Sequence, residues 1–178
     1  MRHIITDAYH ALINKYITDK DIIVDATCGN GNDTYFLASI SKWVYSFDIQ
    51  ENALTNAKLL CQSFDNITYI LDSHENIFKY LDKAKGYCFN LGYLPNGNKD
   101  ITTKEKSTII ALKRIINKLE VGDFIIITFY SHEEGKKEAS AVLDLLKNLD
   151  LRNYDILKTS LEFKKNTPPF FYFILKTN

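Results

Sequence analysis

Residues 22–36 read IIVDATCGNGNDTYF, and this segment says more about the architecture of the chain than any other. An apolar, β-branched run ends in an acid, Asp25, and a loop with two glycines leads into a helix start. A second apolar run, Trp43 to Phe47, ends in another acid, Asp48. This order predicts a strand, a loop, a helix and a second strand that form a nucleoside-binding crevice at the edge of a parallel sheet.

The strand pattern recurs along the chain and alternates with helical patterns. Strands are predicted at 22–26, 43–48, 67–71, 86–91, 123–130, 153–162 and 170–176. Helices are predicted at 33–40, 51–63, 103–119 and 136–149, the third starting with a capping-box spacing of Thr102 and Glu105. The alternation predicts an α/β fold with helices on both faces of the sheet. Residues 163–169 are too short for a crossover helix, so the last two strands must form an antiparallel C-terminal hairpin in a seven-stranded, mostly parallel sheet.

The composition is that of a globular protein. Of 178 residues, 46% are hydrophobic and 25% are charged, which favours one folded domain over residues 1–178. Within residues 1–20 the apolar spacing predicts a helix that packs on the sheet, whereas Asp7 and His10 interrupt any signal peptide or membrane span. We therefore expect no membrane partner.

The cysteines and the net charge narrow the functional classes. Three cysteines without metal-ligand spacing predict reduced thiols, a cytoplasmic location and no metal site. The formal net charge is zero, so a nucleic-acid substrate would need a local basic patch. Such a rim is predicted at the reactive edge by Lys99, Lys104, Lys136, Lys137, Lys164 and Lys165, although charges of this kind are often only solvated.

The first loop lacks the full dinucleotide fingerprint, since Thr34 stands where a third glycine would be. Two strand-end acids with a G-x-G loop between them resemble a class I S-adenosylmethionine methyltransferase instead. Asp25 would organise the loop, Asp48 would accept from ribose hydroxyls, and residues 72–74 would meet the adenine. A glycine turn with strand-end caps is the plain structural alternative. The predicted cofactor-binding residues are Asp25, Thr27, Cys28, Gly29, Asn30, Gly31, Asn32, Asp33, Asp48, Gln50, Asp72, Ser73 and His74.

The fourth strand ends in Asn90-Leu91-Gly92-Tyr93-Leu94-Pro95, where amino-methylating enzymes of this fold often carry an Asn or Asp, two prolines and an aromatic residue. Asn90 and Tyr93 keep the first and fourth positions. A side-chain amide oxygen can hold the N–H groups of an amine while an aromatic ring walls the pocket, although a core position would also explain Tyr93. His132 follows the fifth strand at the same edge and could bind substrate or relay a proton. We therefore predict catalytic roles for Asn90, Tyr93 and His132.

Together these residues resemble a bacterial family once described as rRNA methylases (YtqB-like) and associated with methylation of the tRNA wobble uridine (MnmM). The matching segments are 24–31 with Asp33-Thr34, 47–50, 89–95, Lys99, 101–103, His132, Gly135-Lys136, and Asn166 with Pro168-Pro169. The resemblance implies methylation of the primary amine of 5-aminomethyl-2-thiouridine in the anticodon stem-loop, giving 5-methylaminomethyl-2-thiouridine, by a homodimer. The predicted substrate-binding residues are Lys99, Lys136, Lys165 and Asn166.

Three other functions stay open at this point. The same fold could methylate an rRNA base or a small amine. An enzyme that acts on a small amine would need no basic rim, so the rim distinguishes this alternative from an RNA methyltransferase. The chain could be a non-catalytic S-adenosylmethionine-binding module. A nicotinamide oxidoreductase is disfavoured by the missing third glycine.

Overall fold

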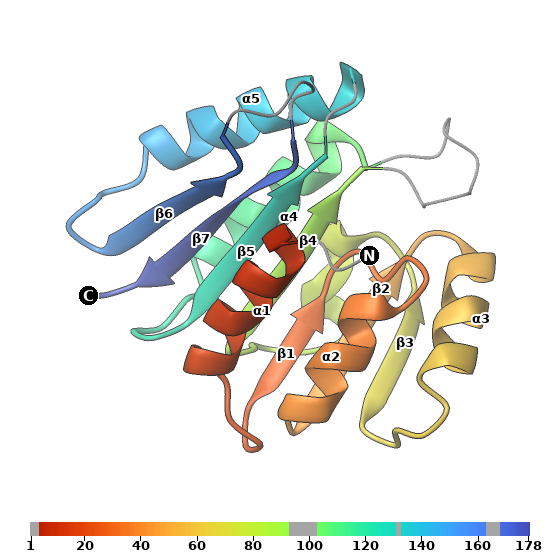
Figure 1. Ribbon diagram of the computed structural model, residues 1–178. Helices are drawn as coiled ribbons and strands as arrows, with labels where there is room; N and C mark the ends of the chain where they lie inside the picture. Colours follow the sequence, from red (N-terminus) through yellow and green to blue (C-terminus); the bar gives the residue numbers. More distant parts are fainter. Residues whose placement is uncertain (1–3, 93–102, 131–132, 163–167) are drawn as a thin grey trace.

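The computed structural model describes residues 4–92, 103–130, 133–162 and 168–178, with the backbone alone for residues 133–136. Its centre is a seven-stranded sheet in the order β3-β2-β1-β4-β5-β7-β6 (Figure 1). The strands are β1 (Ile22–Asp25), β2 (Trp43–Asp48), β3 (Ile67–Leu71), β4 (Gly86–Leu91), β5 (Phe124–Phe129), β6 (Tyr154–Ser160) and β7 (Phe170–Lys176). The predicted mostly parallel α/β sheet is confirmed.

The terminal hairpin is also confirmed. Strand β7 pairs antiparallel with β6, from Tyr154 opposite Lys176 to Ser160 opposite Phe170. It pairs antiparallel with β5 on its other side, whereas the pairs among β1 to β5 are parallel. The carboxyl ends of β1 to β5 therefore meet at one edge of the sheet.

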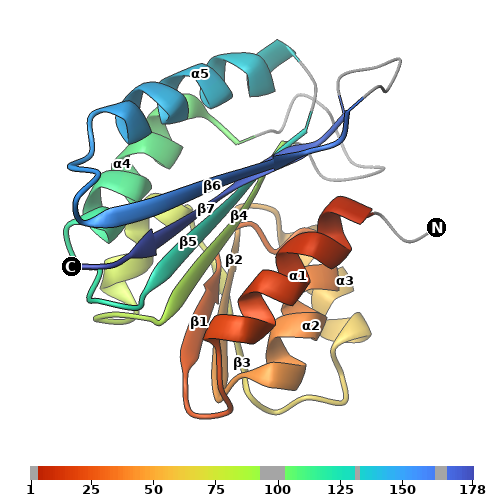
Figure 2. The same cartoon turned by 60° about the vertical axis from the view of Figure 1, so that its left-hand side comes forward.

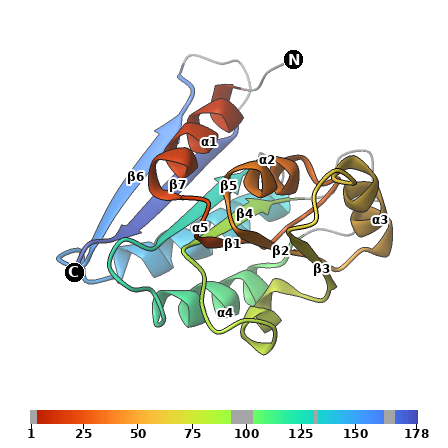
Figure 3. The ribbon, with the colours of Figure 1, turned by 90° about the horizontal axis from the view of Figure 1, so that it is seen from below.

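Helices cover both faces of the sheet, as Figures 2 and 3 show. One face carries the helices α1 (Ile4–Tyr16), α2 (Asn32–Ile40) and α3 (Glu51–Leu60). The other carries the 3₁₀ helix η1 (His74–Lys79) and the helices α4 (Glu105–Ile116) and α5 (Glu133–Lys147). The chain therefore has three layers, with the sheet in the middle.

Two apolar clusters hold these layers together. Along β1, Ile23 packs with α1 and α2, and the next residue, Val24, packs with the layer of η1, α4 and α5. This alternation follows from the period of two in a strand. Each fully buried Ile or Leu stabilises the fold by roughly 1.5–3 kcal/mol relative to exposure. Helix α1 buries Ile5, Tyr9 and Ile13 against the sheet.

Several helical segments differ from the sequence expectation. Helix α4 begins after Lys104, which serves as its N-cap without a side-chain bond, so Glu105 opens the helix and no described side chain closes a capping box. Thr102 lies outside the described residues. No helix was predicted between the strands at 67–71 and 86–91, but η1 lies there, with Ser73 as its N-cap accepting from the backbone N–H of Glu75 at 3.4 Å. Helix α5 starts three residues earlier than the 136–149 expected from its apolar spacing, at Glu133.

No helix among the described residues is long and apolar enough to cross a membrane. Within the same residues, no group of three or more His, Cys, Asp or Glu side chains is placed to hold a metal ion. All three cysteines are free and buried.

Candidate active site at the carboxyl edge of the sheet

The loop after β1 lies between β2 and α3 and is held close to both. The backbone N–H of Cys28 donates to the carbonyl of Phe47 at 2.8 Å, which ties the loop to β2. Gly31 has a φ of 85°, and a Cβ there would lie 2.7 Å from the Cα and Cβ of Ala57 in α3. Gly31 is therefore needed both for the left-handed backbone and for the approach of α3.

Asp48, at the end of β2, uses part of its hydrogen-bonding capacity to hold this loop. One carboxylate oxygen accepts from the N–H of Gly29 and the other from the N–H of Gln50, both at 2.9 Å. Burial raises the pKa of the Asp48 carboxyl group, and the two backbone donors oppose that rise. A carboxylate has about four acceptor sites, so Asp48 can accept from two further donors. The paired hydroxyls of a ribose fit that capacity, and thus an adenosyl cofactor fits the residues present.

Asp25, at the end of β1, is fully buried beneath the loop. Its oxygens accept from the Thr34 hydroxyl at 2.6 Å and from the N–H of Thr27 at 3.3 Å. Burial, with a smaller contribution from the nearby Asp33 carboxylate, raises the pKa of Asp25 to about 7. Asp25 therefore organises the loop from below, and its charge depends on pH near neutrality.

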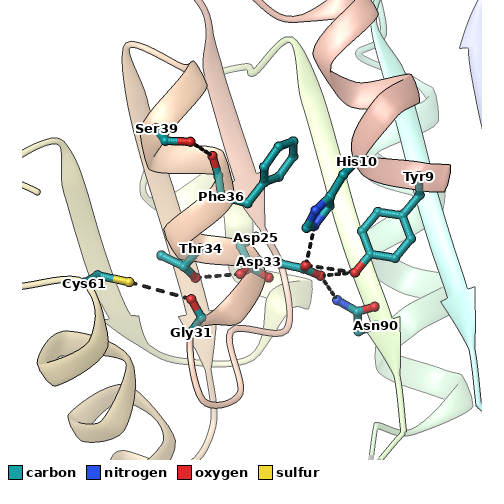
Figure 4. Close-up of polar contacts among 10 residues, drawn as sticks. All are labelled: Tyr9, His10, Asp25, Gly31, Asp33, Thr34, Phe36, Ser39, Cys61 and Asn90. Atoms are coloured by element: carbon teal, nitrogen blue, oxygen red, sulfur yellow. Dashed lines mark hydrogen bonds and ion pairs between the residues drawn. The ribbon is translucent and has the colours of Figure 1, made fainter. Parts of the chain in front are cut away.

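Asp33, in the first turn of α2, contacts three side chains from two other elements, helix α1 and strand β4 (Figure 4). The Tyr9 hydroxyl donates to its two oxygens at 2.8 and 2.7 Å, and His10 Nε2 lies 2.8 Å from Oδ1. Asn90 Nδ2 donates to Oδ2 at 2.5 Å. This carboxylate therefore links helix α1 to the end of strand β4.

Asn90 occupies the centre of the edge. Its backbone N–H donates to the Thr27 hydroxyl at 2.7 Å, which joins β4 to the first loop. Because its Nδ2 faces the Asp33 carboxylate, its Oδ1 points elsewhere, and Oδ1 is buried without a hydrogen-bond partner among the described residues. An unpaired buried acceptor costs about 1–3 kcal/mol, so it marks a position where a donor is expected to bind.

The residue that follows Leu91 is held as firmly as Asn90. Gly92 N–H donates to the Thr103 hydroxyl oxygen at 3.0 Å, and Thr103 N–H donates back to the Gly92 carbonyl at 3.1 Å. The Thr103 hydroxyl in turn donates to the buried carboxylate of Glu138 in α5 at 2.7 Å. These bonds fix the chain just beyond Asn90.

Other predicted cofactor residues fall around the same loop. The Cys28 side chain is buried against Leu54 and Ala57, where burial raises the pKa of its thiol to about 12. The Asn30 side chain accepts from Asn56 at 3.0 Å, and Asn32 is the first residue of α2. Contacts of these residues with a cofactor stay a prediction.

The three residues predicted to meet adenine take part in local structure. Asp72 accepts from Asn76 and Tyr80, while Ser73 caps η1. His74 is buried, with Nε2 at 3.3 Å from the Thr108 hydroxyl, and burial lowers the pKa of its imidazole to about 4. An adenine contact for residues 72–74 also stays a prediction.

Six of the predicted catalytic and substrate-binding residues cannot be placed, and Lys164 of the predicted basic rim also lies outside the described residues. Tyr93, Lys99, His132, Lys165 and Asn166 lie outside the described residues, and so does the side chain of Lys136. Conversely, Tyr9 and His10 contact Asp33 at this edge but were not predicted from the sequence as site residues. Their only signal was their position in an amphipathic N-terminal helix, which predicts burial and no partner.

This strand order, with acids at the ends of β1 and β2 and a glycine loop between them, defines a class I methyltransferase, the class that uses S-adenosylmethionine as its methyl donor. A family model described as "Putative rRNA methylase" matches residues 44–175. The chain belongs to that family, as the resemblance predicted.

Two solved structures are similar to this chain along almost its whole length. A Clostridium thermocellum protein of the same description is 36% identical, with a TM-score of 0.91 over 99% of this chain and 98% of that one. A Streptococcus mutans protein, solved in complex with SAH, is 37% identical, with a TM-score of 0.90 and 99% of each chain covered.

A curated relative is the chloroplastic tRNA (mnm(5)s(2)U34)-methyltransferase of Arabidopsis thaliana, 30% identical over 157 residues. The match covers 77% of this chain and 57% of that protein, so the chain spans little more than half the length of this relative.

Proposed function

We propose that this protein is an RNA methyltransferase that transfers the methyl group of S-adenosylmethionine to the primary amine of 5-aminomethyl-2-thiouridine at the wobble position of tRNA. The product is 5-methylaminomethyl-2-thiouridine. The observation that carries the proposal is the buried Asn90 Oδ1, an acceptor without a described partner at the carboxyl end of β4. The name of the Arabidopsis relative supports this choice of nucleoside, and the family description supports RNA as the substrate.

The chemistry requires an acceptor at this place. When bound, S-adenosylmethionine supplies an electrophilic methyl group on a positively charged sulfur. The amine nitrogen must direct its lone pair at that carbon, so its N–H groups must be held to the side. Asn90 Oδ1 can accept one of them, and Asp33 keeps the amide in the orientation that presents oxygen. As the nitrogen–carbon bond forms, the carbon–sulfur bond breaks, and the new secondary amine carries the positive charge.

Before attack, the amine must lose a proton. Its pKa in water is about 9–10, somewhat below that of lysine, so freeing the lone pair at neutral pH costs about 3–4 kcal/mol. A desolvated site next to a second cation disfavours the ammonium form and reduces this cost. The proposal therefore needs no strong general base, and the proton leaves to solvent.

The test is nucleoside mass spectrometry of tRNA that carries 5-aminomethyl-2-thiouridine, incubated with the protein and S-adenosylmethionine. We expect this nucleoside to be replaced by its monomethylated form. The same tRNA with unmodified uridine at the wobble position is the matched control and should gain nothing. Methylation of the control tRNA, or of rRNA fragments in place of the aminomethyl nucleoside, would contradict the proposal.

A further inference from the structure

Helix α1 contributes two polar side chains to the carboxyl edge, and neither lies in the segment that the family model matches, residues 44–175. Tyr9 and His10 meet Asp33 from 24 and 23 residues away in the sequence. Asp33 also holds Asn90, 57 residues away. Figure 4 shows the three side chains converging on one carboxylate.

We propose that Tyr9 and His10 are positioning residues for methyl transfer. They hold the Asp33 carboxylate in place, and Asp33 in turn orients the Asn90 amide so that Oδ1 faces the substrate amine. This inference rests on the proposed function, since it assigns the role of α1 in the same reaction.

The side-chain amide of Asn90 needs a neighbouring group that fixes its orientation. An asparagine amide has one acceptor end and one donor end of nearly equal size, and a half-turn exchanges them. An ionised carboxylate only accepts, so Asp33 selects the rotamer in which Nδ2 faces it. In the reversed rotamer the amide oxygen would face the carboxylate, and the amine would meet a donor that cannot hold its N–H groups.

The two donors on α1 are themselves rigid. The Tyr9 ring packs edge-on against Phe171 and His10, at centroid distances of 5.9 and 4.8 Å. The His10 ring stacks on Phe36 at 3.7 Å with an angle of 11° between the planes. Burial and the Asp33 carboxylate raise the pKa of the Tyr9 hydroxyl, so it stays a donor at neutral pH. Because an ionised carboxylate only accepts, His10 Nε2 is a donor as well.

The kinetic test uses variants that keep shape and remove donors. Tyr9→Phe keeps the ring but loses both hydroxyl bonds, and His10→Phe keeps the stacking on Phe36. We expect kcat to fall about tenfold in each, with the KM for tRNA and the Kd for S-adenosylmethionine changed less than about twofold. Tyr16→Phe, on the same helix against Phe124 and Phe173, is the matched control and should keep wild-type kcat.

A double-variant cycle then separates positioning from general damage to the fold. If Tyr9 acts through Asn90, Tyr9→Phe should lower kcat no further in an Asn90→Ala background. An additional tenfold loss in that background would overturn the inference, as would unchanged kcat in both single variants.

A measurement without substrate distinguishes failure of the positioning role from failure of the proposed function. In an NMR spectrum of the protein, the side-chain amide signals of Asn90 are identified by their loss in Asn90→Ala. They should shift in Tyr9→Phe and in His10→Phe and stay in place in Tyr16→Phe. Unmoved signals would overturn the positioning role whatever the substrate is. Shifted signals in a protein that leaves the aminomethyl nucleoside unmethylated would refute the proposed function instead.

Discussion

The two halves of the carboxyl edge satisfy their polar groups in different ways. In the half formed by β1 and β2, Asp25 is bonded within nine residues of itself, and Asp48 accepts from Gln50 and Gly29. In the half formed by β4, Asn90 depends on Thr27 and Asp33, which lie 63 and 57 residues away, and its buried Oδ1 has no hydrogen-bond partner among the described residues.

Under the proposed function, the half formed by β1 and β2 is the cofactor half, which binds S-adenosylmethionine, and the half formed by β4 is the reactive half, which holds the substrate amine. The cofactor half is organised mainly by hydrogen bonds among its own loops, and the half-buried Asp48 keeps spare acceptor capacity there. In the reactive half, Asn90 Oδ1 is a buried acceptor without a partner in the described part of the chain, which is costly unless a substrate donor binds there. Substitutions should therefore affect cofactor affinity in the first half and turnover in the second.

The largest effect is expected from a substitution in the reactive half. Asn90→Ala removes the open acceptor, and we expect kcat to fall about 10²–10³-fold, in line with the loss of a preorganised polar group at a reacting centre. Calorimetry should find the Kd for S-adenosylmethionine changed less than about threefold. Asn117→Ala, at the exposed end of α4, is the control. Equal losses in kcat and in affinity for S-adenosylmethionine would contradict the division into a cofactor half and a reactive half.

The next effect tests the buried acid of the cofactor half. The pKa of Asp25 is raised to about 7 in the folded protein, above its value of 3.8 in the unfolded chain. Between these values the folded state binds more protons, so this group lowers the free energy of unfolding as pH rises from about 4 to about 7. From pH 5 to pH 8 the wild type should lose about 2–3 kcal/mol more than Asp25→Asn.

Urea unfolding at several pH values measures this difference. Parallel pH profiles of the wild type and Asp25→Asn would mean that Asp25 keeps an ordinary pKa in the folded protein.

A smaller effect concerns Asp48. Asp48→Asn keeps the size of the side chain but removes its charge and part of its acceptor capacity. We expect the Kd for S-adenosylmethionine to rise about 30-fold, or about 2 kcal/mol, with kcat at saturating cofactor within about threefold of wild type. Asp65→Asn, exposed before β3, should bind normally. A loss of kcat larger than the loss of affinity would move Asp48 into the reactive half.

The smallest expected effect tests whether the cofactor half extends to Ser73, the N-cap of η1. Ser73→Ala removes the cap of this helix, and the free energy of unfolding should fall by about 0.5–1 kcal/mol. If Ser73 also meets the cofactor, as the sequence predicts, the Kd for S-adenosylmethionine should rise about threefold. Ser39→Ala, on the exposed side of α2, controls for loss of a hydroxyl. An unchanged Kd would leave Ser73 as a helix cap alone.

Much of the fold was predictable because its signals are local. The strand runs, the glycine loop and the short connection before Phe170 depend on residue types within a few positions of each other. Helix ends were predicted less well. Apolar spacing extends past the last helical hydrogen bond, so the helix expected over 51–63 ends at Leu60.

The candidate site was predictable only in outline. Strand ends placed Asp25, Asp48 and Asn90 at one edge, because parallel strands share their direction. The same reasoning placed His74 there, and its contact with adenine stays a prediction. Its burial beside Thr108 and its hydrogen bond with the backbone of Ala26 could not be predicted from the sequence, because both depend on how η1 packs against α4 and the end of β1.

The sequence by itself determined the class of fold and the order of acids and glycines along its edge, since periodicity and turn chemistry act over short stretches. Only the tertiary structure decided that Tyr9 and His10 meet Asp33, and that Asp33 turns the amide of Asn90. Those contacts depend on how α1 crosses the sheet. That crossing is set by the packing of Ile5, Tyr9 and Ile13 on strands far away in the chain.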